Sequence, residues 1–219
     1  MSPTAKFNGL LATITVTAMF LLISYGVPYL NQMSLNYPLA LTGAAVVSSA
    51  GLYRILSLGM SWCMGRSERL KGFILGPYYM HGTWVGCFHG HGGHKRFMVE
   101  HYIQDLESLV ITGRSFTDER KPHGYWESES TTIDARKGRI LFTYKFDVLT
   151  RQSSLFGIHS SLFERDSAYS APKSTSGFAH DLNDETRISV SSIKISSALL
   201  SWDEALAKAA SIYNETENG

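Results

Sequence analysis

Aromatic residues, cations and hydroxyls recur together in the C-terminal two thirds of the chain, and this combination suits the binding of nucleobases and phosphates. Stacking on an aromatic ring contributes roughly 1 to 3 kcal/mol per base, and an arginine or lysine pairs with a phosphodiester. Threonine hydroxyls can hydrogen-bond either group. The candidate ligand-binding residues are Tyr78, Trp84, Trp126 and Tyr144 for stacking, Arg114, Lys145, Arg187 and Lys194 for phosphate, and Thr132 and Thr143 for hydrogen bonds.

The same residues also have a plain structural interpretation. An aromatic residue in a β-rich domain is as often part of the core as of a binding site, and a cation on a strand usually lies on a solvated face. Both interpretations stay open at the level of the sequence.

A histidine-rich segment, HGHGGH, places His89, His91 and His94 in one short loop, with His81 and His101 nearby. Three imidazoles at this spacing could ligate zinc, and the intervening glycines could let backbone amides cradle a phosphate. Motifs this loose are usually false positives, and a glycine-rich hairpin turn explains the glycines equally well. We therefore expect no metal ion and no resident cofactor, and keep a zinc-dependent enzyme built on this loop as an alternative.

The many serines of the chain lack the neighbours that nucleophilic catalysis needs. The sequence contains no G-x-S-x-G elbow between a strand and a helix, and no pair of carboxylates has a recognisable catalytic spacing. It therefore predicts no catalytic residues and a protein that is not an enzyme.

Two apolar runs, Phe7 to Leu30 and Pro38 to Met64, lie in the first third of the chain. Each exceeds the roughly 20 residues that a helix needs to cross ~30 Å of hydrocarbon. A cleaved signal peptide fits less well, because its apolar segment has only about 7 to 15 residues. The two runs therefore predict a transmembrane hairpin of two helices.

Basic residues orient this hairpin. Lys6 precedes the first run, the loop of residues 31–37 carries no charge, and the second run is followed by Arg66, Arg69 and Lys71. By the positive-inside rule, both ends of the hairpin, residues 1–71, face the cytoplasm.

The second run contains one charge and several small residues. A charge near the bilayer centre costs roughly 2.5 to 3.5 kcal/mol on insertion scales. The arginine either snorkels to the cytoplasmic interface or lies buried and needs a partner in an oligomer or a water-filled path. Small residues at a four-residue spacing permit close helix contact, within the hairpin or between protomers. The candidate membrane and oligomerisation residues are Ala44, Ala45, Ser48, Ser49 and Arg54.

The formal net charge of +1 is unevenly distributed. Residues 1–71 carry five cations and one acid, whereas the remaining 148 residues carry 15 cations and 18 acids. A mildly acidic domain lacks the broad basic face that long nucleic acid requires, so an anionic ligand must be held by a few local residues. The only cysteines, Cys63 and Cys87, form no disulfide framework and suit a reducing cytoplasm.

The chain from residue 72 to residue 219 consists of short β-rich segments joined by turns. Short successive connections are typical of an antiparallel meander, and eight strands close most simply into an up-and-down barrel. The predicted strands are Gly82 to Phe88, Phe97 to Asp105, Leu109 to Phe116, Tyr125 to Ile133, Ile140 to Val148, Leu155 to Phe163, Gly177 to Leu182 and Ile188 to Ser196, with turns at Gly90 to Gly93, Pro122 to Gly124, Arg136 to Gly138 and Asn183 to Asp184.

One helix follows the strands. Ser201 and Glu204 form a capping box, and the apolar residues after them fall on one stripe, which we expect to lie against the barrel wall. The stripe is Trp202, Ala205, Leu206, Ala209, Ile212 and Tyr213. The expected fold is thus two N-terminal transmembrane α-helices, then an all-β, eight-stranded up-and-down antiparallel barrel with a C-terminal helix.

Alternation along the fourth and fifth strands indicates what fills the barrel. Alternate residues of these strands are charged and should face water: Glu127, Glu129, Lys145 and Asp147. The other parity carries Trp126, Ser128, Ser130 and Thr132, then Ile140, Phe142, Tyr144 and Phe146. A lumen lined by aromatic rings with small hydroxyl residues between them is typical of a ligand pocket rather than a close-packed aliphatic core.

A short motif opens the strand series. Gly82, Trp84, Gly86 and Phe88 have the form GxWxGxF, and its GxW part resembles the first-strand signature of lipocalin-type barrels. The whole plan of two transmembrane helices and a minimal cytosolic barrel resembles the membrane-anchored receptor effectors of bacterial CBASS anti-phage defence, over essentially all 219 residues.

This resemblance implies a function. In that family a partner nucleotidyltransferase makes a cyclic dinucleotide, which is the activating ligand of the barrel. The protein then forms a homo-oligomer in the bacterial inner membrane and disrupts the bilayer, so that the infected cell dies or stops growing. We accordingly expect a multi-pass protein whose termini and barrel are cytoplasmic. The main alternative is a membrane-tethered lipocalin-like barrel that binds a lipid or another apolar ligand.

Overall fold

The computed structural model describes residues 2–26, 28, 38–149, 153–183 and 187–215. Its internal contacts divide the chain into two compact units, Met1–Ile74 and Leu75–Gly219. The sequence-based boundary falls between residues 71 and 72. The first unit is helical, and the second is a β-barrel that carries a C-terminal helix.

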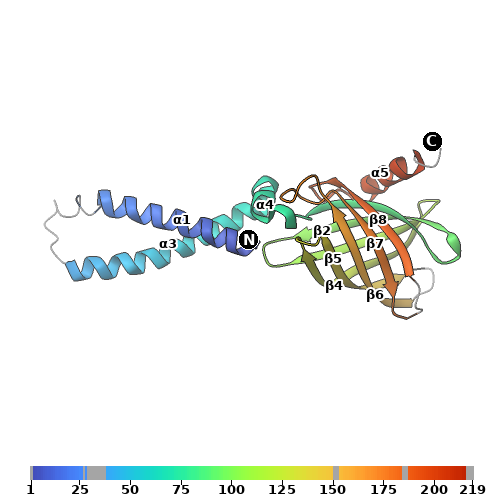
Figure 1. Cartoon of the computed structure of the whole chain (residues 1–219), viewed down its shortest axis with the longest axis horizontal. Coiled ribbons are helices and arrows are strands. Elements are labelled where there is room, and N and C mark those ends of the chain that lie inside the picture. The colour runs from blue at the N-terminus through green and yellow to red at the C-terminus, as the bar shows by residue number, and fades with distance from the viewer. Residues whose placement is uncertain (1, 27, 29–37, 150–152, 184–186, 216–219) are drawn as a thin grey trace. The chain divides into compact units, whose positions relative to one another are not determined.

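Two long helices, α1 (Pro3–Leu21) and α3 (Pro38–Arg66), run side by side in the first unit (Figure 1). α1 begins after Ser2, whose Oγ accepts a hydrogen bond from the Ala5 amide at 3.2 Å. It buries Phe7, Leu11 and Thr15, which lie four residues apart and therefore share one face. The helix continues as the π-helical turn η1 (Leu22–Gly26), and α4 (Glu68–Leu75) follows α3.

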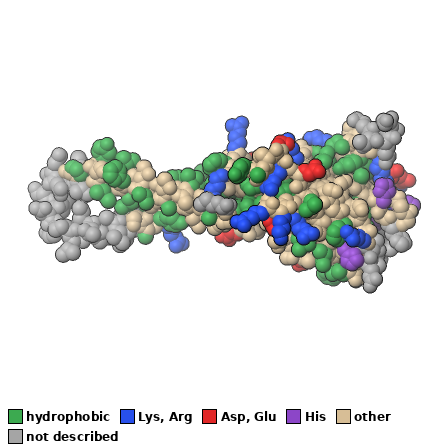
Figure 2. Space-filling view, in the orientation of Figure 1, with side chains coloured by type: hydrophobic (Ala, Val, Ile, Leu, Met, Phe, Trp, Pro, Cys, Tyr) green, Lys and Arg blue, Asp and Glu red, His purple; other side chains and the backbone are tan. Residues whose placement is uncertain are grey.

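The stretch Pro3–Gly26 is the one helix among the described residues that is long and apolar enough to cross a membrane. Figure 2 shows apolar side chains on the surface of the N-terminal helices, and Val16, Phe20 and Leu22 are each more than half exposed. α3 has 29 residues but is less apolar. The expectation of two membrane-spanning helices is therefore met in part, with one helix of spanning length and composition and a second, weaker one.

The candidate oligomerisation residues lie on α3. Arg54 is exposed and Ser49 is half-buried. The side chains of Ala44, Ala45 and Ser48 lie outside the described part of the structure, although the helix backbone passes through them. Their role in helix contact stays a prediction.

Eight antiparallel strands form a closed barrel in which each strand pairs with the next and the last pairs with the first. This confirms the predicted up-and-down barrel, and each strand overlaps the segment that was predicted for it. The strands are β1 (Gly82–His89), β2 (Lys95–Gln104), β3 (Leu109–Thr117), β4 (Pro122–Asp134), β5 (Arg139–Val148), β6 (Ser153–Glu164), β7 (Ser174–Asp181) and β8 (Arg187–Ser196).

One predicted turn is wrong. Residues Pro122 to Gly124 belong to β4, and the β3–β4 turn lies just before them. Arg120 takes a positive φ of 63° there, and its amide donates to the Thr117 carbonyl at 2.8 Å. The proline is tolerated because it begins the strand, where its missing N–H leaves no ladder bond unmade.

The glycines of the GxWxGxF motif permit the barrel to close. β8 approaches β1 so closely that a Cβ on Gly86 would lie 2.2 Å from the Ser191 carbonyl oxygen, and one on Gly82 would lie 2.1 Å from that of Ser196. Gly82 also has a φ of +133°, which L side chains rarely adopt. Both glycines therefore have a structural role at the seam between the first and last strands.

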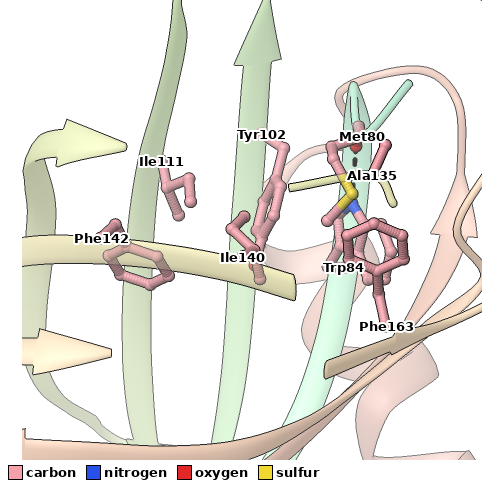
Figure 3. Packing of buried hydrophobic residues seen from close by; sticks show 8 residues of the cluster. All are labelled: Met80, Trp84, Tyr102, Ile111, Ala135, Ile140, Phe142 and Phe163. Atoms are coloured by element: carbon pink, nitrogen blue, oxygen red, sulfur yellow. Dashed lines mark hydrogen bonds between the residues drawn. The ribbon is translucent and has the colours of Figure 1, made fainter. Parts of the chain in front are cut away.

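The tryptophan of the same motif fills one end of the barrel. Trp84 is fully buried, its Nε1 donates to the Met80 carbonyl at 2.8 Å, and its ring stacks on Tyr102 with centroids 5.1 Å apart. Figure 3 shows these side chains converging in the barrel interior. The complete buried cluster is Met80, Trp84, Tyr102, Ile111, Ala135, Ile140, Phe142 and Phe163.

The C-terminal helix α5 (Trp202–Glu215) covers part of the barrel wall, as expected. The Glu204 amide donates to the Ser201 Oγ at 3.2 Å, so the serine half of the predicted capping box is present, while the Glu204 carboxylate accepts from the Lys208 Nζ at 3.1 Å. Ala205 and Ala209 are completely buried against Val85 and Phe97 of the first two strands. Small residues on the helix let the two backbones come close, which fixes the helix to the wall.

Replacing Gly86 by alanine tests whether the seam between β1 and β8 requires a residue without a side chain. The new methyl group would overlap a backbone oxygen of β8, so we expect the free energy of unfolding to fall by about 1 to 3 kcal/mol. Gly90→Ala is the matched control, because its Cβ would meet no atom closer than 3.8 Å. Denaturant unfolding of the full chain in detergent micelles, followed by tryptophan fluorescence, measures both. Equal free energies of unfolding for the two variants would contradict the close approach of β8 to β1 at Gly86.

Candidate ligand-binding cavity

The barrel holds a cavity of about 400 Å³ at the end away from the Trp84 cluster. This volume falls in the range of about 300 to 1,000 Å³ that is usual for small-molecule sites. Its rim includes residues of the β1–β2 turn and His123 near the start of β4, and its wall comes from seven strands, β1, β2 and β4 to β8. The lining residues are Phe88, Gly90, Gly92, His94, Arg96, Met98, Glu100, His123, Trp126, Phe142, Tyr144, Phe146, Val148, Leu155, His159, Ala179, Asp181, Ile188 and Val190.

Aromatic rings from neighbouring strands line the cavity. Trp126 of β4 pairs in register with Phe146 of β5, and their rings meet edge to face with centroids 5.9 Å apart. Phe142 and Tyr144 make a similar contact at 6.1 Å. The prediction that these four side chains face the lumen is confirmed.

A β-bulge changes the inward face of β4 halfway along the strand. The register shifts between Ser128 and Ser130, so that Thr131 pairs with the inward-facing Phe142. The expectation that Ser130 and Thr132 face the lumen is therefore wrong. One extra residue in a strand reverses the parity of every residue after it.

Glu100 is a carboxyl group buried inside the cavity. Its side chain is 2% exposed, the Trp126 Nε1 donates to its Oε1 at 3.3 Å, and the Tyr102 hydroxyl donates to its Oε2 at 3.3 Å. Burial raises the pKa of Glu100 from 4.5 to about 7, and the two hydrogen bonds act in the opposite direction. Among the described residues no lysine, arginine or histidine forms a salt bridge with it.

Sequence analysis missed Glu100, although a signal was present. The residue shares its parity with Met98 and Tyr102, and it stands directly opposite Trp84 in the β1–β2 ladder. An acid on the apolar parity of a strand is unusual. Because the parity of this strand was not assigned, the signal could not be used.

His159 contributes a neutral polar surface to the cavity wall. Its ring stacks on Phe142 with centroids 4.4 Å apart and planes 13° apart, and its Nε2 shares a hydrogen bond with the Ser161 hydroxyl at 2.6 Å. Burial lowers the pKa of His159 to about 4. The ring is therefore uncharged near neutral pH and presents a flat face rather than a cation.

Polar groups at the cavity rim have unused hydrogen-bonding capacity. The Arg96 Nε and the His123 Nδ1 are buried and have no hydrogen-bond partner among the described residues. The Arg96 Nη1 donates to the Lys95 carbonyl at 3.1 Å, so the side chain is held in place by one bond. Buried polar atoms without partners are rare in proteins and often mark a place where a ligand or water binds.

The structure brings only some of the predicted ligand-binding residues together. Trp126 and Tyr144 line the cavity. Trp84 and Tyr78 belong to the packed end, where the Tyr78 carbonyl accepts from the Gln104 Nε2 at 2.7 Å. Lys194 also lies there, with its Nζ 4.1 Å from the centroid of the Tyr79 ring. None of these three residues lines the cavity.

The other predicted residues lie on the outer wall of the barrel. Thr132 and Lys145 are exposed, and Thr143 shares a hydrogen bond with the Ser130 hydroxyl at 2.8 Å on the outer surface. The Arg114 and Arg187 guanidiniums are exposed and lie 4.5 Å and 3.8 Å from the ring centroids of Trp202 and Phe178 respectively. None of these five residues faces the lumen, so none can touch a ligand inside the cavity.

The histidine-rich loop forms the β1–β2 turn, with the short helix η3 (His91–Gly93) and positive φ angles at Gly92 and Gly93. Among the described residues no three His, Cys, Asp or Glu side chains lie together as a metal site would require. The side chain of His91 lies outside the described part, so the three-imidazole hypothesis is not tested. Gly90 and His94 form part of the cavity rim.

Comparison with known proteins gives no independent assignment: the chain matches no protein-family model and no curated protein. The closed barrel and the N-terminal apolar helix fit a membrane-anchored barrel. Chemically, the cavity offers flat aromatic faces, one deep acid and a cation at the rim.

Glu100→Gln provides a test of the buried acid. Because the pKa is raised from 4.5 to about 7, the native state holds this proton more tightly than the unfolded chain. The stability that Glu100 contributes is therefore present below pH 4.5 and is lost as the pH rises toward 7. This loss amounts to about 3 kcal/mol, which the glutamine variant does not suffer.

We expect the free energy of unfolding of Glu100→Gln, minus that of the wild type, to increase by about 3 kcal/mol from pH 4.5 to pH 8. Denaturant unfolding in micelles at several pH values measures this difference. His159 titrates in both proteins, so its opposite effect between pH 4 and 6.5 cancels. Parallel pH profiles for the two proteins would contradict the burial of the acid.

Proposed function

We propose that this chain is a membrane-anchored receptor that binds a cyclic dinucleotide in its barrel. The observation that carries the proposal is a cavity that combines stacking faces with a cation at its rim. Trp126, Tyr144 and Phe146 offer aromatic surface to a base. Arg96 offers to a phosphodiester oxygen its Nε, which has no partner within the described part of the chain.

The cavity has an aromatic interior and a polar rim, and this division suits such a ligand. The bases of a cyclic dinucleotide are flat and largely apolar on their faces, so they favour the aromatic interior. The two phosphodiesters are charged and costly to bury, so they favour the rim, where Arg96, His94 and His123 lie. The mildly acidic character of the remaining surface argues against a long polynucleotide.

The helices supply the membrane part of the proposal. α1 and α3 form a hairpin in the bacterial inner membrane, with both termini and the barrel in the cytoplasm. A ligand that binds an assembled state more tightly shifts the equilibrium toward assembly by its differential affinity. Confinement in the plane of the membrane raises the effective concentration of the hairpins, which meet through Ala44, Ala45, Ser48 and Ser49 of α3.

The resulting function is that of an effector in a CBASS antiviral defence system. A partner nucleotidyltransferase supplies the cyclic dinucleotide, the protein forms a homo-oligomer, and the assembled hairpins disrupt the membrane so that the infected cell stops growing or dies. The support is the combination of an apolar N-terminal helix with a hollow barrel, together with the resemblance of the whole plan of N-terminal helices and barrel to that family.

A binding experiment tests the receptor proposal. The full chain in detergent micelles is titrated by calorimetry with 3′,3′ cyclic dinucleotides of every purine and pyrimidine combination. We expect one member to bind, and Arg96→Ala to weaken this binding at least tenfold, because the phosphate then loses a charge-assisted hydrogen bond. Arg187→Ala is the matched control and should bind as the wild type does, since this arginine lies on the outer wall.

The second candidate function is the carriage of a lipid or another apolar ligand. It is favoured by the aliphatic share of the cavity lining, which includes Met98, Val148, Leu155, Ile188 and Val190. If no cyclic dinucleotide binds, and solvent extraction of the purified protein with mass spectrometry recovers a stoichiometric lipid, this function replaces the first.

Arg54→Leu tests the membrane part. In the proposed assembly the clustered Arg54 side chains attract water and anionic headgroups, so the leucine variant should lose toxicity in cells that also make the nucleotide. Binding of the cyclic dinucleotide should be unchanged, as calorimetry can check. A variant that remains toxic would show that Arg54 has no part in the lesion.

A further inference from the structure

The carboxyl group of Glu100 faces the cavity with neutral partners only. It is 2% exposed, it lines the cavity, and its hydrogen bonds come from the Trp126 indole and the Tyr102 hydroxyl. A buried acid normally has a cation beside it. Among the described residues Glu100 has none, so the unused capacity of the carboxyl is available to a ligand.

The two partners fix the kind of ligand atom that Glu100 can take. An indole N–H donates only, so Oε1 must accept from Trp126. Oε2 accepts from Tyr102, whose pKa is raised well above 10, which keeps the proton on this hydroxyl. With one donor on each oxygen, the group is arranged as a carboxylate acceptor, and its remaining lone pairs require two more donors.

On the basis of the proposed function, we propose that Glu100 selects the base of the ligand by accepting two N–H hydrogen bonds from the edge of a guanine ring. Guanine presents adjacent N–H donors from its ring nitrogen and its amino group. Adenine and cytosine present one donor beside an acceptor, and uracil presents one donor between two acceptors. Any of these three would direct a lone pair at the carboxylate.

Trp126 links stacking to this selection. Its Nε1 holds the Glu100 Oε1 at 3.3 Å, while its ring lines the same cavity. The side chain of Trp126 is also fixed from behind, because a Cβ on Gly113 would lie only 2.1 Å from it. The ring therefore holds the carboxyl group in a defined direction and offers its own surface to the base.

Protons compete with guanine for Glu100. The ligand requires the carboxylate, whose pKa is about 7 in the free protein, so binding should weaken about tenfold from pH 8 to pH 6 through this group. The other titratable or charged groups around the cavity are His94, Arg96, His123, Tyr144, His159 and Asp181, with Tyr102 and Lys194 on the inner face toward the packed end. Comparison with a variant that lacks only the Glu100 carboxyl separates its effect from theirs.

The test is calorimetry of the full chain in micelles with the panel of cyclic dinucleotides described above, which includes cyclic di-GMP and cyclic di-AMP, at pH 6 and pH 8. The wild type should prefer cyclic di-GMP by roughly 10- to 100-fold at pH 8, as expected for one bidentate contact. Glu100→Gln should lose this preference, because an amide offers one donor and one acceptor. It should also lose the additional tenfold change with pH. Glu127→Gln, on the outer parity of β4, should behave as the wild type does.

The possible results are distinguishable. If the wild type binds cyclic di-AMP or a pyrimidine dinucleotide better than cyclic di-GMP, or if Glu100→Gln retains the guanine preference, the selection by Glu100 is wrong while the receptor proposal stands. If the wild type binds no cyclic dinucleotide at either pH, both proposals fail together. Intact folding of the variant is checked by its unfolding curve.

Discussion

The contact between β1 and β8 is the constraint on which the cavity depends. Without this seam the eight strands would form an open sheet, and the aromatic faces of β4 and β5 would be exposed to water. Closure requires the last strand to approach the first at Gly82 and Gly86, where any side chain would overlap a carbonyl oxygen. Gly82 and Gly86 thus permit the enclosed interior to form, and Phe88 of the same motif lines the cavity.

The same motif determines which end of the barrel is hollow. Trp84 gathers a buried cluster that fills one end, so the polar groups at the other end share a cavity of low dielectric character. There burial raises the pKa of Glu100 to about 7 and lowers that of His159 to about 4. A site of this kind distinguishes ligands by hydrogen-bond donors and acceptors, since each unpaired group inside it is costly.

The sequence was sufficient for the strands and insufficient for the site. Strand-forming composition, turn residues, helix caps and alternation are local properties, and the strand positions, the C-terminal helix and the inward face of β5 followed from them. The bulge after Ser128 leaves no trace in a run of serines and threonines, and it turned Thr132 outward. Glu100 became recognisable only through its pairing with β1. Arg114 and Arg187 were chosen for their chemistry, and such a choice contains no information about which face of a strand they occupy.

The most direct test of the account is whether a base stacks on Trp126. Tryptophan fluorescence of the full chain in micelles should be quenched in a saturable way by one cyclic dinucleotide, since a stacked base quenches an indole. At saturating ligand, Trp126→Phe should lose most of the quenching, because Trp62, Trp84 and Trp202 lie outside the cavity. Quenching that is equal in the two proteins, or absent with every cyclic dinucleotide, would contradict the claim that the barrel interior is the binding site.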